Sequence, residues 1–194
     1  MLSPSASKKT IKRLRRLGVE VHLNILVESC ENGKVCMSAG NLGADLIIWT
    51  AGSKPTEFYS KNPDAFTLGR GGRVVVDDYL RSTHNRNIYV IGDNADTKYS
   101  GMAQTALHNA IYVAKSLILE RRDKSPQKYR PKKPVYVTTV GPKWAVAQVG
   151  GRILTGRAGW SIRRQADLSI FKNFQPYKEA IKTWRQADKM TNLD

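Results

Sequence analysis

The sequence predicts an α/β protein with a small α+β unit at its C-terminal end. Two apolar runs rich in β-forming residues, at 44–49 and 87–91, are each followed by a glycine-containing turn, as is typical of buried strands. The second run leads into a helical pattern over 101–114, with small residues on one face. Farther along, two stretches alternate apolar and polar residues around Gly141-Pro142, which predicts an antiparallel pair of strands.

The other elements can be predicted in chain order. Residues 5–17 combine basic residues with a one-sided apolar pattern, which predicts an amphipathic helix that Gly18 ends. The expected elements after it are a strand at 19–25, a hairpin of 26–29 with 34–38, a strand at 44–49, a strand at 73–76 after a Gly-Gly turn, a strand at 87–91, the helix at 101–114, a basic linker at 121–134, strands at 135–140, 145–149 and 152–155, a helix at 158–174 and a last basic helix to about residue 188.

Cys30 and Cys36 lie on the two arms of the predicted hairpin, with the turn signal Asn32-Gly33 between them. Facing positions on a hairpin can form a disulfide, but two cysteines in a chain without a secretory signal favour a reduced pair. The cysteines have no neighbouring cluster of His or carboxylate residues, so no zinc site is predicted.

Asp93 follows the apolar run 87–91 and Gly92 directly, so its carboxylate stands at the carboxyl end of the predicted strand. Open α/β sheets bind their ligands at that edge. The next helix offers unpaired N–H groups and a positive dipole end at its start. A flavin nucleotide has hydroxyl groups that a carboxylate can bind and a ring with a polar edge that the start of a helix can bind. A carboxylate next to a helix start therefore suits a flavin nucleotide. A strand-Gly-Asp turn is also common in α/β folds, where the Asp can simply cap the turn.

The stretch 87–110, NIYVIGDNADTKYSGMAQTALHNA, resembles the second flavin motif of the pyridine nucleotide–disulfide oxidoreductase superfamily, whose members carry two dinucleotide-binding domains. The resemblance implies that Asp93, which follows Gly92, binds the ribityl hydroxyls of FAD. It also implies that the backbone near Ala103 and Gln104 faces the pyrimidine edge of the flavin ring.

Residues 103–106, Ala-Gln-Thr-Ala, further resemble a helix start of the type II (non-proton-pumping) NADH dehydrogenases. In that family a second Gln usually stands four residues after the first, and the pair lines the quinone site. This chain has His108 in that place. The resemblance therefore implies an acceptor site at Gln104 and His108, with the identity of the acceptor left open.

Residues 41–55, NLGADLIIWTAGSKP, resemble the connector with which the same family returns from its NAD(H)-binding lobe to its flavin lobe. Gly52 permits a positive φ or a backbone close to a ligand, and Pro55 fixes the direction in which the chain leaves the turn. Gly52 is therefore a further cofactor-binding candidate. The two motifs occur in the order that the family shows.

No Gly-x-Gly-x-x-Gly sequence occurs in the 194 residues, although the family uses one such loop for the flavin pyrophosphate and one for NAD(H). The resemblance thus implies partial FAD- and NAD(P)-binding Rossmann-like lobes. Residues 1–48 would end the NAD(H)-binding lobe, 49–120 would be the C-terminal segment of the FAD-binding lobe, and 121–194 would form a basic C-terminal unit. The chain is interpreted as truncated or split, with the N-terminal lobes encoded upstream or on a separate chain.

The implied function is that of an FAD-dependent NADH dehydrogenase. A hydride passes from NADH to the flavin, and electrons pass on to a quinone or another small acceptor. Two alternatives stay open: another flavoprotein NAD(P)H or ferredoxin reductase of the same superfamily, or a non-catalytic basic module that binds lipid or nucleic acid. The sequence has no helix-turn-helix pattern and no base-stacking aromatic motif, which disfavours specific nucleic-acid recognition.

The net charge of +16 is concentrated in the C-terminal part. Residues 115–194 hold 18 of the 32 Lys and Arg but 6 of the 16 acidic residues, which gives this part a charge of +12. Such a charge favours an anionic partner such as a membrane surface, although it can also serve solubility alone. We expect a cytoplasmic protein, which in one interpretation is bound peripherally to the cytoplasmic face of a membrane. Its C-terminal helices would then contact lipid or form a homodimer interface.

Overall fold

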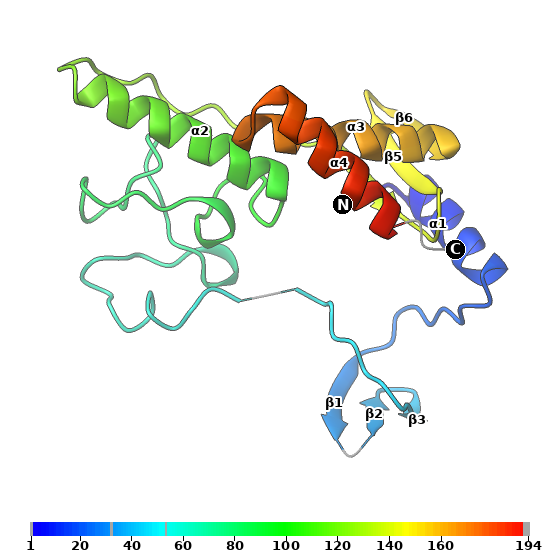
Figure 1. Ribbon diagram of the computed structural model, residues 1–194. Coiled ribbons are helices and arrows are strands. Elements are labelled where there is room, and N and C mark those ends of the chain that lie inside the picture. Colours follow the sequence, from blue (N-terminus) through cyan, green and yellow to red (C-terminus); the bar gives the residue numbers. More distant parts are fainter. Residues whose placement is uncertain (1, 32, 53, 192–194) are drawn as a thin grey trace. The chain divides into compact units, whose positions relative to one another are not determined.

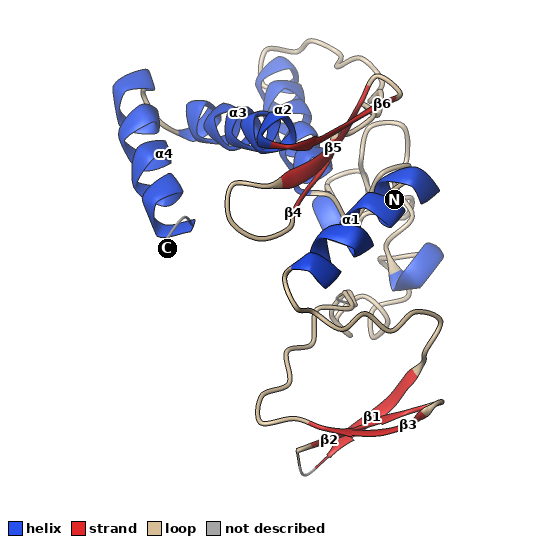
Figure 2. Ribbon diagram, turned by 90° about the vertical axis from the view of Figure 1, so that its right-hand side faces the viewer, coloured by secondary structure: helices blue, strands red, loops and turns tan. Residues whose placement is uncertain are grey.

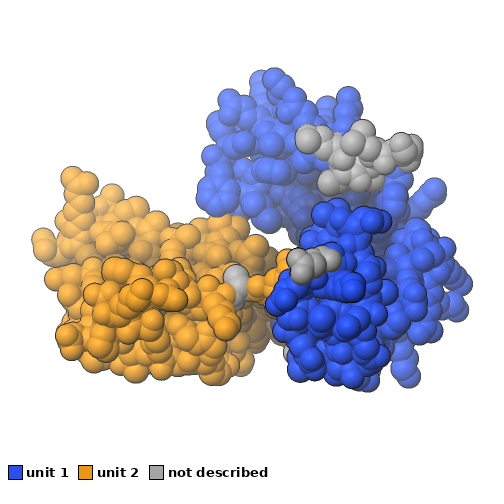
Figure 3. All heavy atoms as spheres, turned by 90° about the horizontal axis from the view of Figure 1, so that it is seen from below, with its two compact units in different colours: residues 1–48, 135–194 blue, residues 49–134 orange. Residues whose placement is uncertain are grey.

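The computed structural model describes residues 2–31, 33–52 and 54–191. These residues form four α-helices and two three-stranded antiparallel sheets, so the mixed α/β class is confirmed. The chain divides into two compact units (Figure 3). Unit 1 combines Met1–Ile48 with Val135–Asp194, and unit 2 comprises Trp49–Pro134. None of the helices in the described part is long and apolar enough to cross a membrane.

Unit 1 begins with α1 (Pro4–Arg16), which confirms the predicted amphipathic helix. Ser3 caps it by accepting a hydrogen bond from the Ala6 backbone N–H, and a proline stands in its first turn, where a missing N–H costs nothing. The helix packs on the C-terminal sheet. Arg13 stacks over the ring of Trp144 and donates to the carbonyl oxygen of Val140 at 3.4 Å.

The first sheet contains β1 (Val27–Glu31), β2 (Lys34–Met37) and β3 (Gly40–Gly43) in that order. The predicted hairpin is confirmed, and β3 adds a third strand that the sequence pattern did not indicate. Cys36 faces Ser29 in the register, whereas Cys30 faces Val35, the residue before Cys36. The two cysteines therefore point to opposite faces of the hairpin, and both are free thiols.

The C-terminal sheet and its helices confirm the predicted α+β unit. Gly159 lies in α3 where that helix packs on β5, and an added Cβ would meet the backbone carbonyl of Ala145. The elements are β4 (Tyr136–Thr139), β5 (Ala145–Val149), β6 (Arg152–Gly156), α3 (Arg157–Phe174) and α4 (Tyr177–Thr191) (Figure 2).

Gly159→Ala is therefore expected to destabilise unit 1. Alanine normally stabilises a helix interior by about 1 kcal/mol relative to glycine. Here the collision with the β5 backbone should outweigh that gain and lower the free energy of unfolding by about 1–3 kcal/mol. Thermal and urea unfolding followed by circular dichroism measure the change. Gly43→Ala is the matched control, because nothing lies within 4 Å of its added Cβ. Equal stability of the two variants would mean that α3 moves away from the sheet at no cost.

Unit 2 is built from loops packed against α2 (Ala103–Glu120), with the short 3₁₀ turns η1 (Arg70–Gly72) and η2 (Gly92–Asn94) (Figure 1). Arg81 and the hydroxyl of Tyr89 both hydrogen-bond the carboxylate of Glu120, which ties the loops to the end of α2. The core residues are Phe66, Val74, Val90 and Ala95.

Four predicted strands are not strands in the structure. The segments at 73–76 and 87–91 are extended and partly buried, but they take part only in isolated bridges such as Val74 with Ala95 and Arg81 with Tyr89. The segments at 19–25 and 44–49 pair with no strand of the described residues. An apolar run indicates burial, whereas a strand also needs a neighbour that satisfies its backbone N–H and C=O groups.

Candidate flavin and acceptor site

The turn η2 lies directly against α2 at the point where the sequence places its Gly-Asp motif. The backbone N–H of Gly92 donates to Oδ1 of the fully buried Asn109 at 3.0 Å. Gly92 has a φ of 64°, and an added Cβ would lie 3.3 Å from the Cβ of Ala106. Both the backbone conformation and this close approach to the helix favour glycine. Gly92 thus sets how near the next residue, Asp93, comes to the start of α2.

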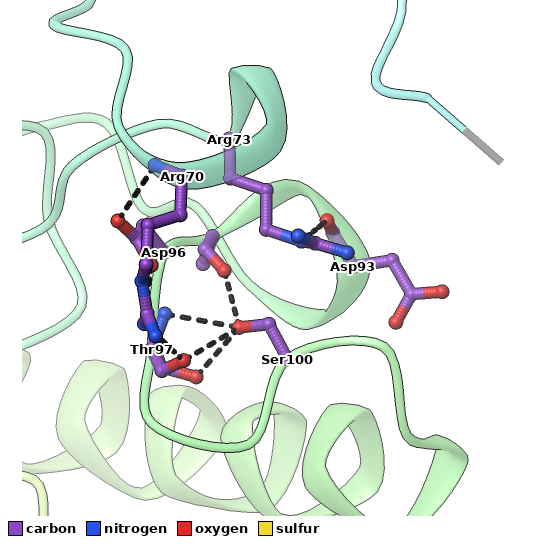
Figure 4. A network of polar contacts seen from close by, with 7 residues as sticks. Arg70, Arg73, Asp93, Asp96, Thr97 and Ser100 are labelled. Atoms are coloured by element: carbon purple, nitrogen blue, oxygen red, sulfur yellow. Dashed lines mark hydrogen bonds and ion pairs between the residues drawn. The ribbon is translucent and has the colours of Figure 1, made fainter. Parts of the chain in front are cut away.

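Asp93 presents an exposed carboxylate. Its backbone carbonyl oxygen accepts a hydrogen bond from Nε of Arg73 at 3.0 Å, which fixes the main chain of the turn. The side chain points away from the neighbouring polar network, as Figure 4 shows. Its carboxylate makes no ion pair or hydrogen bond with the described residues, so its acceptor oxygens face outward.

An ion pair between the partly buried Asp96 and the exposed Arg70 supports this turn from the other side. Arg70 binds Asp96 through Nη2 and Nε, at 2.6 and 3.0 Å from Oδ1, and its backbone N–H donates to Oδ2 at 3.1 Å (Figure 4). These hydrogen bonds lower the pKa of the Asp96 carboxyl below its ordinary value of 3.8 and raise the pKa of Arg70. Ser100 adds a second anchor by donating to the carbonyl oxygen of Ala95.

The Asp96 pair predicts an acid-sensitive unit 2. Because the pKa of Asp96 is lower in the folded than in the unfolded chain, its stabilisation is fully present above the unfolded value and is lost as the pH falls through the folded value. Asp96→Asn should therefore flatten the acid limb of stability against pH. Urea unfolding over a pH series measures this, with the exposed Asp64→Asn as the control. A steep acid limb that persists in Asp96→Asn would assign the sensitivity to other groups.

The first turn of α2 leaves donors available. Met102 occupies the N-cap position without a side-chain cap, and no acidic residue stands in the first turn. Ala103 is exposed and Gln104 is half-buried. Thr105 is 4% exposed, and its hydroxyl has no hydrogen-bond partner among the described residues. An unpartnered buried hydroxyl costs about 1–3 kcal/mol unless another group satisfies it.

The predicted small-residue face of this helix needs correction. The residues that α2 buries are Thr105, Asn109, Val113 and Ser116, whereas Ala103 and Ala114 are exposed. The buried face is therefore partly polar. The predicted face is right for Ala106, which lies against Gly92, and for the buried Val113, and it is wrong for Ala103 and Ala114. Alanine fits both a packed and a solvated helix face, so its pattern alone does not identify the buried side.

His108, the second residue of the predicted acceptor site, packs against the basic segment that follows α2. Its Nδ1 lies 3.2 Å from the hydroxyl of Tyr129, and the two rings are tilted at 5.4 Å between centroids. Burial and the neighbouring charges of Lys132 and Lys115 lower the pKa of the imidazole. The lowered pKa favours the neutral imidazole, which can both donate and accept a hydrogen bond.

Gly52 does not join these contacts in the described part of the structure. It is exposed, has a φ of 105°, and nothing lies within 4 Å of an added Cβ. The positive φ agrees with the predicted turn, but its role toward a cofactor stays a prediction. Sequence reasoning also missed Asn109, Thr105 and Arg73. A polar residue on the buried side of an apolar helix was the available signal for the first two.

The C-terminal helices α3 and α4 hold several of their aromatic side chains partly buried against each other. The indole N–H of Trp184 donates to the Arg164 carbonyl oxygen at 2.9 Å, and the Arg164 guanidinium stacks on its ring. Trp160, Phe171 and Trp184 line a cavity of about 200 Å³ between α3 and α4. The exposed aromatic residues stand at the corner between the helices: Phe174 at 71% and Tyr177 at 62%.

The chain is similar in sequence to a known family of oxidoreductases and to several of its relatives. The family model described as "Pyridine nucleotide-disulphide oxidoreductase" matches residues 1–111. The type II NADH:quinone oxidoreductase NdhA of Mycobacterium tuberculosis is 26% identical over 82% of this chain, and human ferroptosis suppressor protein 1 is 25% identical over 92%. The chain spans 37% and 50% of the length of these two relatives.

A solved structure shows the same fold at low identity. NDH2 from Plasmodium falciparum in complex with NADH superposes with a TM-score of 0.77 and 14% identity. The match covers 97% of this chain and 54% of NDH2.

Proposed function

The chain belongs to the pyridine nucleotide-disulphide oxidoreductase family, and from that premise we propose that it forms the flavin-facing part of an FAD-dependent NADH dehydrogenase with a quinone-like acceptor. The observation that carries the proposal is the turn Gly92-Asp93 seated against the start of α2, with an outward carboxylate beside an uncapped helix end. The relatives named type II NADH:quinone oxidoreductase support the choice of reaction.

The residues at this place fit FAD. The carboxylate of Asp93 can accept hydrogen bonds from the ribityl hydroxyls. The backbone N–H of Ala103, in the first turn of α2 where no side chain caps the helix, can donate to a carbonyl at the ring edge. Gly92 keeps the turn close enough to α2 for the two contacts to serve one ligand. When bound, FAD supplies the hydride-accepting and electron-donating chemistry, and this chain orients it.

We assign the acceptor side to Gln104 and His108. A neutral imidazole can hydrogen-bond a quinone carbonyl without placing a charge beside an apolar ring. The tyrosine hydroxyl of Tyr129, 3.2 Å from Nδ1, holds the ring of His108 and leaves Nε2 as the atom that would meet the acceptor. His108 stands where the type II enzymes usually have Gln, so this contact would distinguish the chain within the family.

The proposal includes a second polypeptide portion that carries the two pyrophosphate-binding loops. The sequence lacks Gly-x-Gly-x-x-Gly, and the relatives are about two to three times as long as the part matched here. The run 46–49 supports this view, because Leu46, Ile48 and Trp49 are 75%, 74% and 63% exposed in an extended segment. Consecutive large apolar side chains in water are typical of a surface that another polypeptide covers.

Flavin reconstitution tests the proposal. The chain alone should bind FAD weakly or not at all. Co-expressed with an N-terminal family polypeptide that carries both glycine-rich loops, it should purify as a yellow complex with a flavin absorbance spectrum. A stoichiometric flavin spectrum from the 194-residue chain alone would contradict the divided site. A colourless complex that contains both polypeptides would contradict the flavin assignment itself.

For localisation we propose that the corner between α3 and α4 meets an anionic bilayer. Phe174 and Tyr177 are exposed on either side of Pro176, and the ammonium of Lys172 lies 4.9 Å from the Tyr177 ring centroid. Exposed aromatic side chains beside basic ones are the usual composition of an interfacial contact. Such a contact would bring the protein to an acceptor dissolved in the membrane.

A further inference from the structure

A basic groove on α1 has no role in the proposed flavin or acceptor site. It lies between α1 and the segment after it, has a volume of about 660 Å³, and is open to solvent. Four exposed cations and two aliphatic side chains line it: Lys8, Ile11, Lys12, Arg15, Arg16 and Leu23. The lining contains no carboxylate, and none of the four cations forms an ion pair within the described residues.

The orientation of α1 is fixed by its opposite face. Ala6 is fully buried, Arg13 stacks on Trp144, and the backbone N–H of Ser3 donates to Gln148 Oε1 at 2.6 Å. These contacts hold the helix on the C-terminal sheet of the same unit (Figure 2). The groove side therefore faces outward as a preformed surface.

The charges on the groove side repel one another. Lys8 and Lys12 are four residues apart, as are Lys12 and Arg16, and like charges at this spacing destabilise a helix. The negative end of the helix dipole offsets the repulsion for Arg15 and Arg16, which stand in the last turn. It does not reach the two lysines. A bound anion would relieve the repulsion at all four positions.

We propose that this groove binds a small soluble anion that carries several linked phosphates. The first and last of the four cations, Lys8 and Arg16, are eight positions apart, or about 12 Å along the helix. A single phosphate cannot contact all of them, whereas a phosphate chain can. Ile11 and Leu23 lie beside the cations and can contact an apolar group attached to the chain, such as a nucleoside. The inference is independent of the flavin and acceptor site.

The test is calorimetric titration of the full chain with orthophosphate, tripolyphosphate and ATP over a salt series. Tripolyphosphate should bind more tightly than orthophosphate, and salt should weaken it because the pairs are exposed. Tighter binding of ATP than of tripolyphosphate would identify a nucleotide as the source of the phosphates. Equal binding of ATP and tripolyphosphate would mean that the groove recognises the phosphate chain alone. Absence of tripolyphosphate binding at low salt would overturn the proposal.

Two charge-matched variants separate a site from general attraction. Lys12→Gln removes a cation from the groove and should weaken tripolyphosphate binding about fivefold, which corresponds to about 1 kcal/mol. Lys9→Gln removes an exposed cation of the same helix outside the groove and should change binding less than twofold. Circular dichroism verifies that both variants keep their helix content. Equal losses in the two variants would mean that the anion senses only the net charge of α1 and would overturn the site.

Discussion

Asp93→Ala is expected to weaken FAD binding roughly tenfold to a hundredfold in the complex with the N-terminal family polypeptide. The variant loses a carboxylate whose hydrogen bonding to the ribityl chain would contribute about 1.5–3 kcal/mol in total. Because this carboxylate makes no bond within the described protein, its removal should leave unit 2 folded. Fluorescence titration of the apo-complex with FAD measures the affinity, and urea unfolding verifies the stability.

The control for this prediction follows from the structure. Asp77, another aspartate of unit 2, is unsuitable as the control, because it accepts hydrogen bonds from the backbone N–H groups of Tyr79 and Arg81 and its replacement would disturb the loop itself. Asp64 is exposed, and Asp64→Ala removes one negative charge from the same unit. Equal loss of FAD affinity in Asp93→Ala and Asp64→Ala would make Asp93 an ordinary turn residue.

Local signals predicted the elements that are stabilised locally. The one-sided apolar pattern predicts a helix at 5–17 that Gly18 ends, and the structure places α1 at Pro4–Arg16. The C-terminal sheet was predictable because its strands are neighbours in sequence and alternate in polarity around Gly141-Pro142. Both predictions depend on residues within a few positions of each other.

The strand predicted at 44–49 failed for the opposite reason. Its apolar pattern indicates that the segment is suited to burial. Whether the segment forms a strand depends on a second strand to pair with, which the pattern does not predict. The structure leaves Leu46 and Ile48 in solvent, since no described strand lies beside them. A strand at 44–49 would need a neighbouring strand, and the pattern of the segment itself does not reveal one, as is true of most central strands of α/β sheets.

The positions of the candidate site residues along the chain were predictable from the sequence. The hydrogen bonds that hold these residues in place were not. Gly92 and Asp93 follow an apolar run, and this order was sufficient to place a turn at the start of α2. The bond from Gly92 to Asn109 joins positions seventeen residues apart. The helical pattern marks Asn109 as a polar residue on the buried side of α2, but it does not identify Gly92 as its partner, because a buried amide is explained only by the backbone that approaches it.

Binding to anionic vesicles is expected to depend on the corner between α3 and α4, and to keep a salt-resistant part. Basic residues near an anionic surface contribute about 1 kcal/mol each and are screened by salt, whereas burial of Phe174 and Tyr177 is not. Nucleic-acid binding through phosphates should instead fall almost completely as salt is added. Vesicle sedimentation and duplex DNA binding over one salt series distinguish these two partners.

The double variant Phe174→Ser and Tyr177→Ser should therefore abolish the salt-resistant vesicle binding and leave the low-salt binding largely in place. Trp184→Ser is unsuitable as the test, because the Trp184 indole is bonded to Arg164 and its loss would loosen the helix pair. Phe58, exposed in unit 2, provides a matched aromatic control outside the corner. If Phe58→Ser removes as much salt-resistant binding as the double variant, the bilayer does not select the α3–α4 corner. If binding of the unaltered chain vanishes at moderate salt, its cations alone hold it at the surface, and the aromatic corner has no part in membrane contact.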